Sequence, residues 1–241
     1  MIRRRRAPLL LLATAAVGGV VALAGCASEP PERVSAPTTH ATPSLAPAAS
    51  PTPSAAPIRI VTLGDSLMSG SGLEYGEAWP ELLGQREGVS VTNLACGGMG
   101  FVVSGECGTS YAGFSPAIAA LQPELIIVQS SSNDFWQDPD DIRADTDDTV
   151  IQLRDAAPDA AIIGLSTIWN DDPDVPEDTA TTSDALRDAV DSVGGTFIDV
   201  GQPLAGHLDW LQDDDVHPTA LGQRAIEQAV LSALRKAGVL P

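Results

Sequence analysis

Four short polar segments hold the side chains of this chain that are best suited to chemistry. In chain order they are Gly-Asp-Ser-Leu at 64–67, Asn-Leu-Ala-Cys-Gly-Gly at 93–98, Ser-Ser-Asn-Asp at 131–134 and Asp-Asp-Val-His-Pro at 214–218. A serine hydroxyl is a poor nucleophile until a neighbouring base takes its proton, and a carboxylate can orient an imidazole that serves as this base. The segments therefore hold the residue types that nucleophilic catalysis requires.

Hydrophobic patterning places each segment next to a predicted element. Strands are predicted at 58–63, 89–94, 125–129, 161–165 and 196–200, and helices at 77–87, 138–157, 178–193 and 218–237. Apolar runs that alternate with helical periods predict a three-layer α/β/α sandwich with a five-stranded, mostly parallel sheet. Because the carboxyl ends of parallel strands share one edge of the sheet, the four segments should converge there.

The four segments resemble, in order and spacing, the motif blocks of the SGNH hydrolases, also called the GDSL family of esterases and lipases. A Gly-Asp-Ser tripeptide is common by chance, but four blocks across 58–241, with Asp214 and His217 three residues apart, are specific. The resemblance implies a flavodoxin-like SGNH hydrolase fold and a serine esterase. The chain has no Gly-x-Ser-x-Gly sequence, which disfavours the α/β-hydrolase family.

The resemblance also implies roles for five residues. Ser66 is the implied nucleophile, His217 its base and Asp214 the acid that orients the base. Gly98, through its backbone N–H, and Asn133, through its side-chain amide, are implied to join the N–H of Ser66 in an oxyanion hole. Loss of one such donor costs roughly 10²–10³-fold in turnover.

Each of these polar residues also has a structural interpretation. Ser66 can cap a helix after a strand, and His217 can cap the last helix beside Pro218. Asn133 and Asp134 can form a side-chain-stabilised turn, and we expect Asp134 to do such structural work.

Three positions need comment. Ser131 stands where the family usually has Gly, which predicts an altered loop or an added hydroxyl near the pocket. Ala95 stands where Gly is common, although Gly98 keeps its spacing. Asp215 is a second candidate for the orienting acid, but the Asp-x-x-His spacing favours Asp214.

Two tryptophans and a second histidine lie near the predicted site. Trp136 and Trp169 follow the third and fourth strands, where they can line an acyl pocket or pack in the core. His207 is expected on the surface or at the pocket rim.

The start of the chain is typical of an exported lipoprotein. Arg3–Arg6 and the apolar stretch Leu9–Ala24 read as a signal peptide over 1–25, which is too short and interrupted for a membrane span. The sequence Leu-Ala-Gly-Cys that ends at Cys26 resembles a lipobox and implies lipid attachment there, the alternative being an ordinary signal peptide. Residues 26–57, rich in Pro, Ala, Ser and Thr, are predicted to be a tether that holds a hydrolase domain, 58–241, outside the bacterial cell membrane.

Two cysteines remain in an exported domain once Cys26 carries lipid. Such an even pair predicts a Cys96–Cys107 disulfide, which would close the loop that holds Gly98. The functional hypothesis is that the bridge holds the oxyanion donor in place, and the alternative is that it only staples the loop.

Charge and composition narrow the partners. The chain carries 32 acidic against 13 basic residues, a net charge of −19, which excludes nucleic-acid binding. No metal-ligand cluster or phosphate-binding loop is present in the sequence, so no cofactor is expected. We expect a monomer that hydrolyses short-chain or acetyl esters of small molecules or carbohydrates. The alternatives are an acyltransferase acting on cell-envelope glycans and a non-catalytic glycan-binding module.

Overall fold

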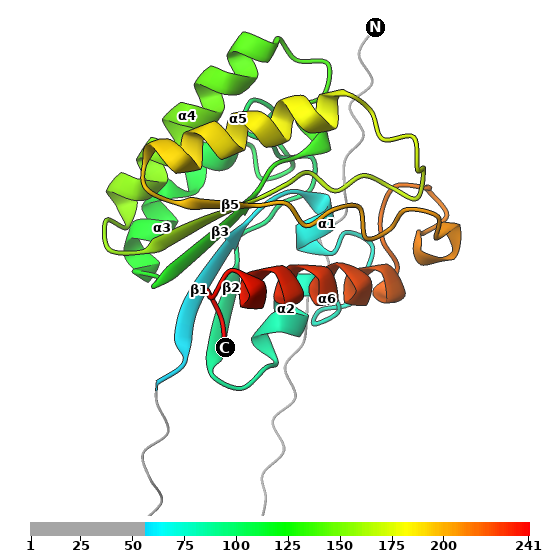
Figure 1. The fold of residues 1–241 in the computed structure, drawn as a ribbon, viewed down its shortest axis with the longest axis horizontal. Coiled ribbons are helices and arrows are strands. Elements are labelled where there is room, and N and C mark those ends of the chain that lie inside the picture. The colour runs from blue at the N-terminus through cyan, green and yellow to red at the C-terminus, as the bar shows by residue number, and fades with distance from the viewer. Residues whose placement is uncertain (1–55) are drawn as a thin grey trace, which may run out of the picture. The chain divides into compact units, whose positions relative to one another are not determined.

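Five parallel strands form the sheet at the centre of the fold (Figure 1). Each is a short apolar run, and the bounds are β1 Ile58–Leu63, β2 Val89–Asn93, β3 Leu125–Gln129, β4 Ala161–Leu165 and β5 Thr196–Ile198. Their order across the sheet is β2-β1-β3-β4-β5, so β2 lies on one side of β1 and the three later strands follow on its other side. The predicted sandwich is therefore confirmed, and its sheet is wholly parallel. The computed structural model describes residues 56–241.

Helices cover both faces of the sheet (Figure 1). Their bounds are α1 Ser66–Ser69, α2 Trp79–Gly84, α3 Ser115–Leu121, α4 Pro139–Ala156, α5 Asp178–Ser192 and α6 Ala220–Lys236. Residues of α1, α2 and α6 share one buried cluster with the sheet, and residues of α3, α4 and α5 share the other. Short 3-10 turns lie at Tyr111–Phe114, Ser132–Asp134 and Leu208–Trp210.

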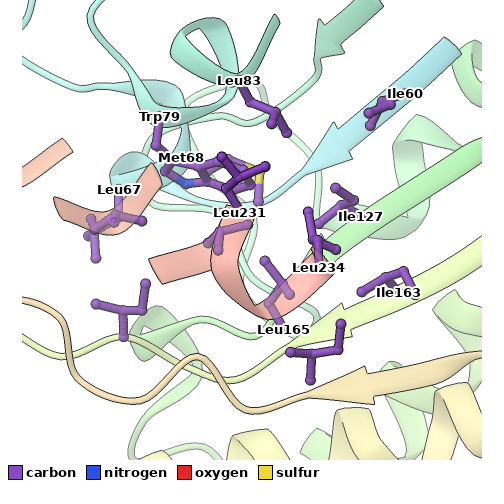
Figure 2. Packing of buried hydrophobic residues seen from close by; sticks show 14 of the residues in the cluster. Ile60, Leu67, Met68, Trp79, Leu83, Ile127, Ile163, Leu165, Leu231 and Leu234 are labelled. Atoms are coloured by element: carbon purple, nitrogen blue, oxygen red, sulfur yellow. The ribbon is translucent and has the colours of Figure 1, made fainter. Parts of the chain in front are cut away.

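The alternation of side chains along β3 separates the two buried clusters. Ile127 packs with Trp79 and Leu234 on the face covered by α2 and α6 (Figure 2). Ile126 and Val128 point to the opposite face and belong to the cluster under α3, α4 and α5. All residues of β3 are buried, as expected for a central strand of a parallel sheet covered on both sides.

The predicted and observed elements differ mainly at short segments. The four-residue α1 and the seven-residue α3 were not predicted, because one or two turns give too few residues for a helical period. The predicted helix over 77–87 is shortened to Trp79–Gly84, where Pro80 occupies the first turn.

Some predictions concern residues that the structure does not describe. The signal peptide over 1–25 and lipid attachment at Cys26 lie outside the described residues, as does nearly all of the tether. Among residues 56–241, no helix combines the length and the apolar composition that crossing a bilayer requires.

Candidate active site

Ser66 lies at the first position of α1, three residues after the end of β1 at Leu63. The side chain of Asp65 caps this turn by accepting a hydrogen bond from Leu67 N at 2.9 Å. Ser66 is 8% exposed, and among residues 56–241 neither its N–H nor its Oγ has a hydrogen-bond partner of its own. The turn therefore presents a free hydroxyl and a free N–H at the carboxyl edge of the sheet.

Asp214 and His217 form a hydrogen-bonded pair just before α6. Asp214 Oδ2 lies 2.5 Å from His217 Nδ1, and Asp214 Oδ1 accepts from the backbone N–H groups of His217 at 2.9 Å and Val216 at 3.1 Å. The His217 side chain and these N–H groups lower the pKa of Asp214 from 3.8 to about 2. The carboxylate is thus ionised at neutral pH, and it engages Nδ1, leaving Nε2 of His217 as the nitrogen that can accept a proton.

Asp215, the other candidate acid, is placed differently. Its backbone has φ 56°, a left-handed conformation, and its carbonyl oxygen lies 3.4 Å from Asn170 Nδ2. Of the two neighbouring acids, Asp214 is the one that bonds His217.

Two further donors lie on neighbouring loops. Asn133 Nδ2 donates to the Met99 carbonyl at 3.0 Å, which uses one of its two amide hydrogens and holds the side chain beside Gly98. Gly98 is exposed with φ 70°, a conformation that favours glycine, and its N–H has no acceptor among residues 56–241. Together with the Ser66 N–H, these groups can serve an oxyanion.

Hydrogen bonds join the second and third segments to the one that bears Ser66, and a further bond joins the residues that flank the fourth and the first segments. Cys96 N donates to the Gly64 carbonyl at 3.1 Å, and Ser131 Oγ donates to Asp65 Oδ2 at 2.6 Å. Gln212, next to the acidic run, donates through Nε2 to the Ser71 carbonyl at 2.8 Å. The predicted convergence on one edge is therefore what the structure shows.

Ser66 and His217 are not hydrogen-bonded to each other in the described structure. Their neighbours nevertheless line one small pocket of about 30 Å³, made by Leu67, Ser132, Ile168, Trp169, Asn170 and Val216. Nucleophile and base are often poorly aligned before substrate binds, so this geometry is compatible with a Ser–His pair.

The tryptophan predictions have different outcomes. Trp169 lines this pocket, and its ring stacks on Phe135 with centroids 5.4 Å apart. Trp136 is 83% exposed with φ 62°, so it does not pack in the core, and it is not among the residues that line this pocket. His207 stacks on Trp210 with centroids 3.6 Å apart and is exposed, consistent with its predicted surface position.

Asp134 is a structural residue that binds a loop distant in the sequence as well as its own turn. It is fully buried and accepts hydrogen bonds from the backbone N–H groups of Phe101 at 2.7 Å, and Val102 and Val103 at 3.1 Å each. Burial raises the pKa of Asp134, and these N–H groups act in the opposite direction. The predicted local turn is thus only part of its role, because Asp134 anchors the loop that follows Gly98.

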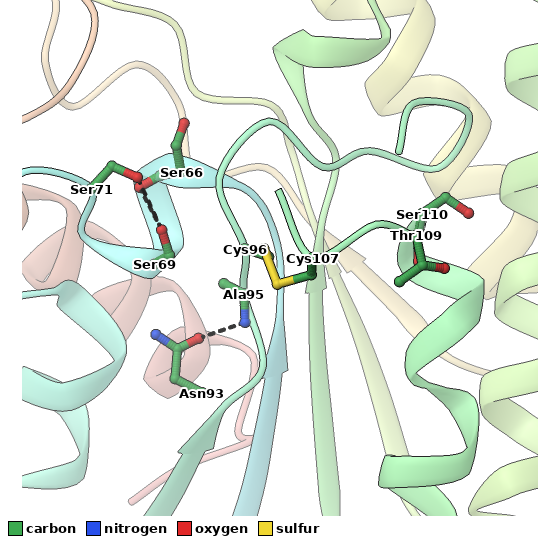
Figure 3. The surroundings of a disulfide bond; sticks show 9 residues. All are labelled: Ser66, Ser69, Ser71, Asn93, Ala95, Cys96, Cys107, Thr109 and Ser110. Carbon is green, nitrogen blue, oxygen red and sulfur yellow. Dashed lines mark hydrogen bonds between the residues drawn. A yellow bond between two sulfur atoms is a disulfide. The ribbon is translucent and has the colours of Figure 1, made fainter. Parts of the chain in front are cut away.

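The predicted disulfide is present and closes that loop from its other end (Figure 3). It joins Cys96 to Cys107, with Cα atoms 6.3 Å apart. At the start of the loop, Asn93 Oδ1 accepts from Ala95 N at 3.1 Å. Gly98 is therefore held between a covalent bridge and the carboxylate of Asp134.

We expect the Cys96→Ser/Cys107→Ser double variant to lose both stability and turnover. Opening a loop of this length lowers the free energy of unfolding by about 2–3 kcal/mol. If the bridge also holds the Gly98 N–H in place, kcat should fall about tenfold with little change in KM. Melting curves and ester hydrolysis well below both melting temperatures check this. Full turnover with earlier melting would show that the bridge only staples the loop.

Comparison with known families extends these observations. The model of the GDSL-like lipase/acylhydrolase family matches residues 62–225, a span that includes all four polar segments. No sequence among the curated proteins matches this chain.

Solved structures share the fold at low identity. The salicylyl-acyltransferase SsfX3 from a tetracycline biosynthetic pathway is 20% identical, with a TM-score of 0.63 over 78% of this chain and 57% of its own. A family two carbohydrate esterase from Clostridium thermocellum is 15% identical, with a TM-score of 0.59 over 78% and 66% of the two chains. The psychrotrophic esterase EstA from Pseudoalteromonas sp. is 18% identical, with a TM-score of 0.57 over 74% and 97%.

Proposed function

Because the chain belongs to the GDSL-like lipase/acylhydrolase family, we propose that it is a serine esterase that forms an acyl-enzyme on Ser66. The observation that carries the proposal is the Asp214–His217 pair at 2.5 Å, whose neighbour Val216 lines the same pocket as Leu67, the residue after the unbonded Ser66. An imidazole that a carboxylate holds by a hydrogen bond and an unbonded serine hydroxyl at the same sheet edge are the groups that nucleophilic acyl transfer needs.

The reaction would proceed in two steps, acylation of Ser66 and hydrolysis of the acyl-enzyme. Ser66 Oγ attacks the ester carbonyl carbon while its proton passes to Nε2 of His217, and the oxyanion accepts hydrogen bonds from Ser66, Gly98 and Asn133. The C–O bond to the alcohol then breaks, and His217 protonates the leaving oxygen. In the second step Nε2 of His217 takes a proton from water as the water oxygen attacks the acyl carbon. The bond between the acyl carbon and Ser66 Oγ then breaks, His217 returns the proton to Oγ, and the acid leaves.

The pocket beside the nucleophile favours a short acyl group. Its volume of about 30 Å³ is about twice the space that a single water needs. Leu67, Ile168, Trp169 and Val216 make most of its wall apolar, which suits the methyl group of an acetyl ester better than a longer chain. The net charge of −19 disfavours anionic substrates, so a neutral small-molecule or carbohydrate ester is the proposed substrate class.

Export and lipid anchoring are part of the proposal. The Cys96–Cys107 disulfide is typical of an oxidising compartment. Together with the signal sequence and the lipobox-like residues before Cys26, it supports an enzyme tethered to the outer face of the bacterial cell membrane.

An acyltransferase is the second candidate. The similarity in fold to the salicylyl-acyltransferase SsfX3 favours it, and the same residues would carry the first step. The two functions differ in whether water or a sugar hydroxyl attacks the acyl-enzyme.

Hydrolysis of p-nitrophenyl esters from acetate to decanoate by the purified protein tests the proposal, with Ser66→Ala as the control. We expect activity that falls with chain length, and labelling of Ser66 by a serine-directed phosphonate. The transferase would be favoured by a different result: Ser66 is labelled, hydrolysis is slow, and an added sugar speeds turnover and receives the acyl group. A folded protein that neither hydrolyses nor labels would contradict both and favour a glycan-binding module.

Replacing Trp169 with alanine is expected to shift the chain-length preference. Removing the indole enlarges the acyl pocket, so activity on butyrate relative to acetate should rise about 5–10-fold, although lost stacking on Phe135 lowers stability. Trp136→Ala is the matched control, since that side chain is exposed and outside the pocket. An unchanged preference in Trp169→Ala would place the acyl group elsewhere.

A further inference from the structure

Ser131 lies in the buried base of the site. It lies between β3 and the 3-10 turn Ser132–Asp134 and is 0% exposed, so its hydroxyl cannot reach bound substrate. The hydroxyl makes two hydrogen bonds, donating to Asp65 Oδ2 at 2.6 Å and accepting from Asn133 N at 3.0 Å. The sequence predicted that Ser131 alters the loop or adds a hydroxyl to the pocket. In the structure its hydroxyl instead bonds two groups inside the protein.

The two partners of Ser131 belong to different parts of the site. Asp65 directly precedes Ser66, and its other oxygen caps the turn that Ser66 begins, through the 2.9 Å bond from Leu67 N. Asn133 bears the side-chain amide that is tied to the Met99 carbonyl. The Ser131 hydroxyl therefore joins the turn that begins at Ser66 to the turn that bears Asn133, and its bond to Asp65 spans 66 positions of sequence.

Burial makes this link consequential. Asp65 is 6% exposed, and burial raises the pKa of its carboxyl, while the hydrogen bond from Ser131 acts in the opposite direction and favours the ionised form. A glycine at 131 can make neither bond. It would leave Asp65 Oδ2 and the Asn133 N–H without these partners, and Asp65 is buried, where an unpaired polar group is costly.

We propose that Ser131 is a positioning residue whose hydroxyl sets the separation between the Ser66 nucleophile and the Asn133 oxyanion donor. The proposal rests on the esterase function proposed above. Acyl transfer is sensitive to misplacement of about 1 Å, because the attacking oxygen and the oxyanion donors must act on one carbonyl group together. A loose link between the two turns should therefore lower kcat and leave KM almost unchanged.

Ser131→Ala tests the proposal, with Ser130→Ala as the matched control. Ser130 is the neighbouring residue and equally buried, but its hydroxyl contacts Thr167 Oγ1 at 2.6 Å and the Leu165 carbonyl at 3.4 Å on β4, away from Ser66. We expect Ser131→Ala to lower kcat for p-nitrophenyl acetate by about 10–100-fold, with KM changed less than twofold. Ser130→Ala should melt earlier to a similar extent but keep kcat within about threefold.

A second variant covers a failure to fold. Ser131→Cys keeps the shape of the side chain with a weaker donor and acceptor, and its kcat should fall between those of the wild type and Ser131→Ala. If the alanine variant does not fold, a cysteine variant with at least threefold lower kcat supports the proposal, and one with wild-type kcat overturns it.

Two results would overturn the proposal in distinguishable ways. If wild-type protein hydrolyses esters and Ser131→Ala keeps kcat, or loses it no more than Ser130→Ala does, the positioning role is wrong and the esterase function stands. If wild-type protein neither hydrolyses esters nor labels with a phosphonate at Ser66, both proposals fail together.

Discussion

Replacing His217 with alanine is expected to lower kcat for ester hydrolysis by about 10⁴-fold or more. Without the imidazole, no neighbouring group takes the proton of Ser66 Oγ, and the leaving alcohol has no acid to protonate it. The fold should survive, because the His217 side chain is partly exposed and that of its partner Asp214 is half-exposed. Steady-state kinetics on p-nitrophenyl acetate, with circular dichroism to verify folding, measure the effect.

His207→Ala is the matched control for that experiment. His207 is the other histidine of residues 56–241, and its ring stacks on Trp210. We expect it to retain wild-type turnover even if the protein melts earlier. Equal losses in the two variants, or a loss below tenfold in His217→Ala, would remove His217 as the base.

The Asp214 carboxylate also has a consequence for the pH profile. Its pKa lies at about 2 in the folded protein, below its ordinary 3.8, because His217 and two backbone N–H groups favour the charged form. A carboxyl whose pKa is depressed on folding stabilises the folded protein at pH values above its ordinary pKa of 3.8, and this stabilisation is lost as the pH falls through about 2. Protonation of Asp214 is therefore not expected to limit activity at pH values above about 4.

Replacing Asn133 with alanine is expected to lower kcat by about 10²–10³-fold with little change in KM. Its amide would bind the oxyanion only after the carbonyl becomes tetrahedral, so the ground-state complex loses little. The same amide donates to Met99 O at 3.0 Å, so the alanine variant also frees the loop that carries Gly98. Kinetics on p-nitrophenyl acetate check the split between kcat and KM.

Gln137→Ala provides the control for Asn133→Ala. Gln137 is exposed on the same loop and carries the same amide group, so its removal should leave kcat unchanged. If Asn133→Ala loses less than threefold in kcat while Gly98 stays in place, Asn133 is not an oxyanion donor. Because Gly98 would act through its backbone, no side-chain substitution tests it as directly.

Much of the fold could be predicted because most of its strands are short apolar runs with clear ends. The strands at 125–129 and 161–165 lie where the sequence predicts them, since each is an apolar run bounded by polar residues. Elements of one or two turns, such as α1 and α3, were missed because they carry too little periodicity to distinguish them from loops.

The same division applies to the site. Sequence was enough to locate Ser66, Asp214 and His217 near one sheet edge and to pair Cys96 with Cys107, because residue type, spacing and strand ends restrict the choices. Tertiary structure decided which groups touch. Asp65, which accepts from Ser131, and the backbone N–H groups that Asp134 binds lie 31 to 66 positions from these residues in the chain, and they meet because β1 lies between β2 and β3 in the sheet.

The exposure of Trp136 and the small size of the pocket beside Trp169 were likewise decided by the fold. Both residues follow strands of similar apolar character, so their local sequences predict the same environments. Local patterning can place a residue at the end of a strand, but the direction and burial of its side chain depend on how distant loops pack around that strand.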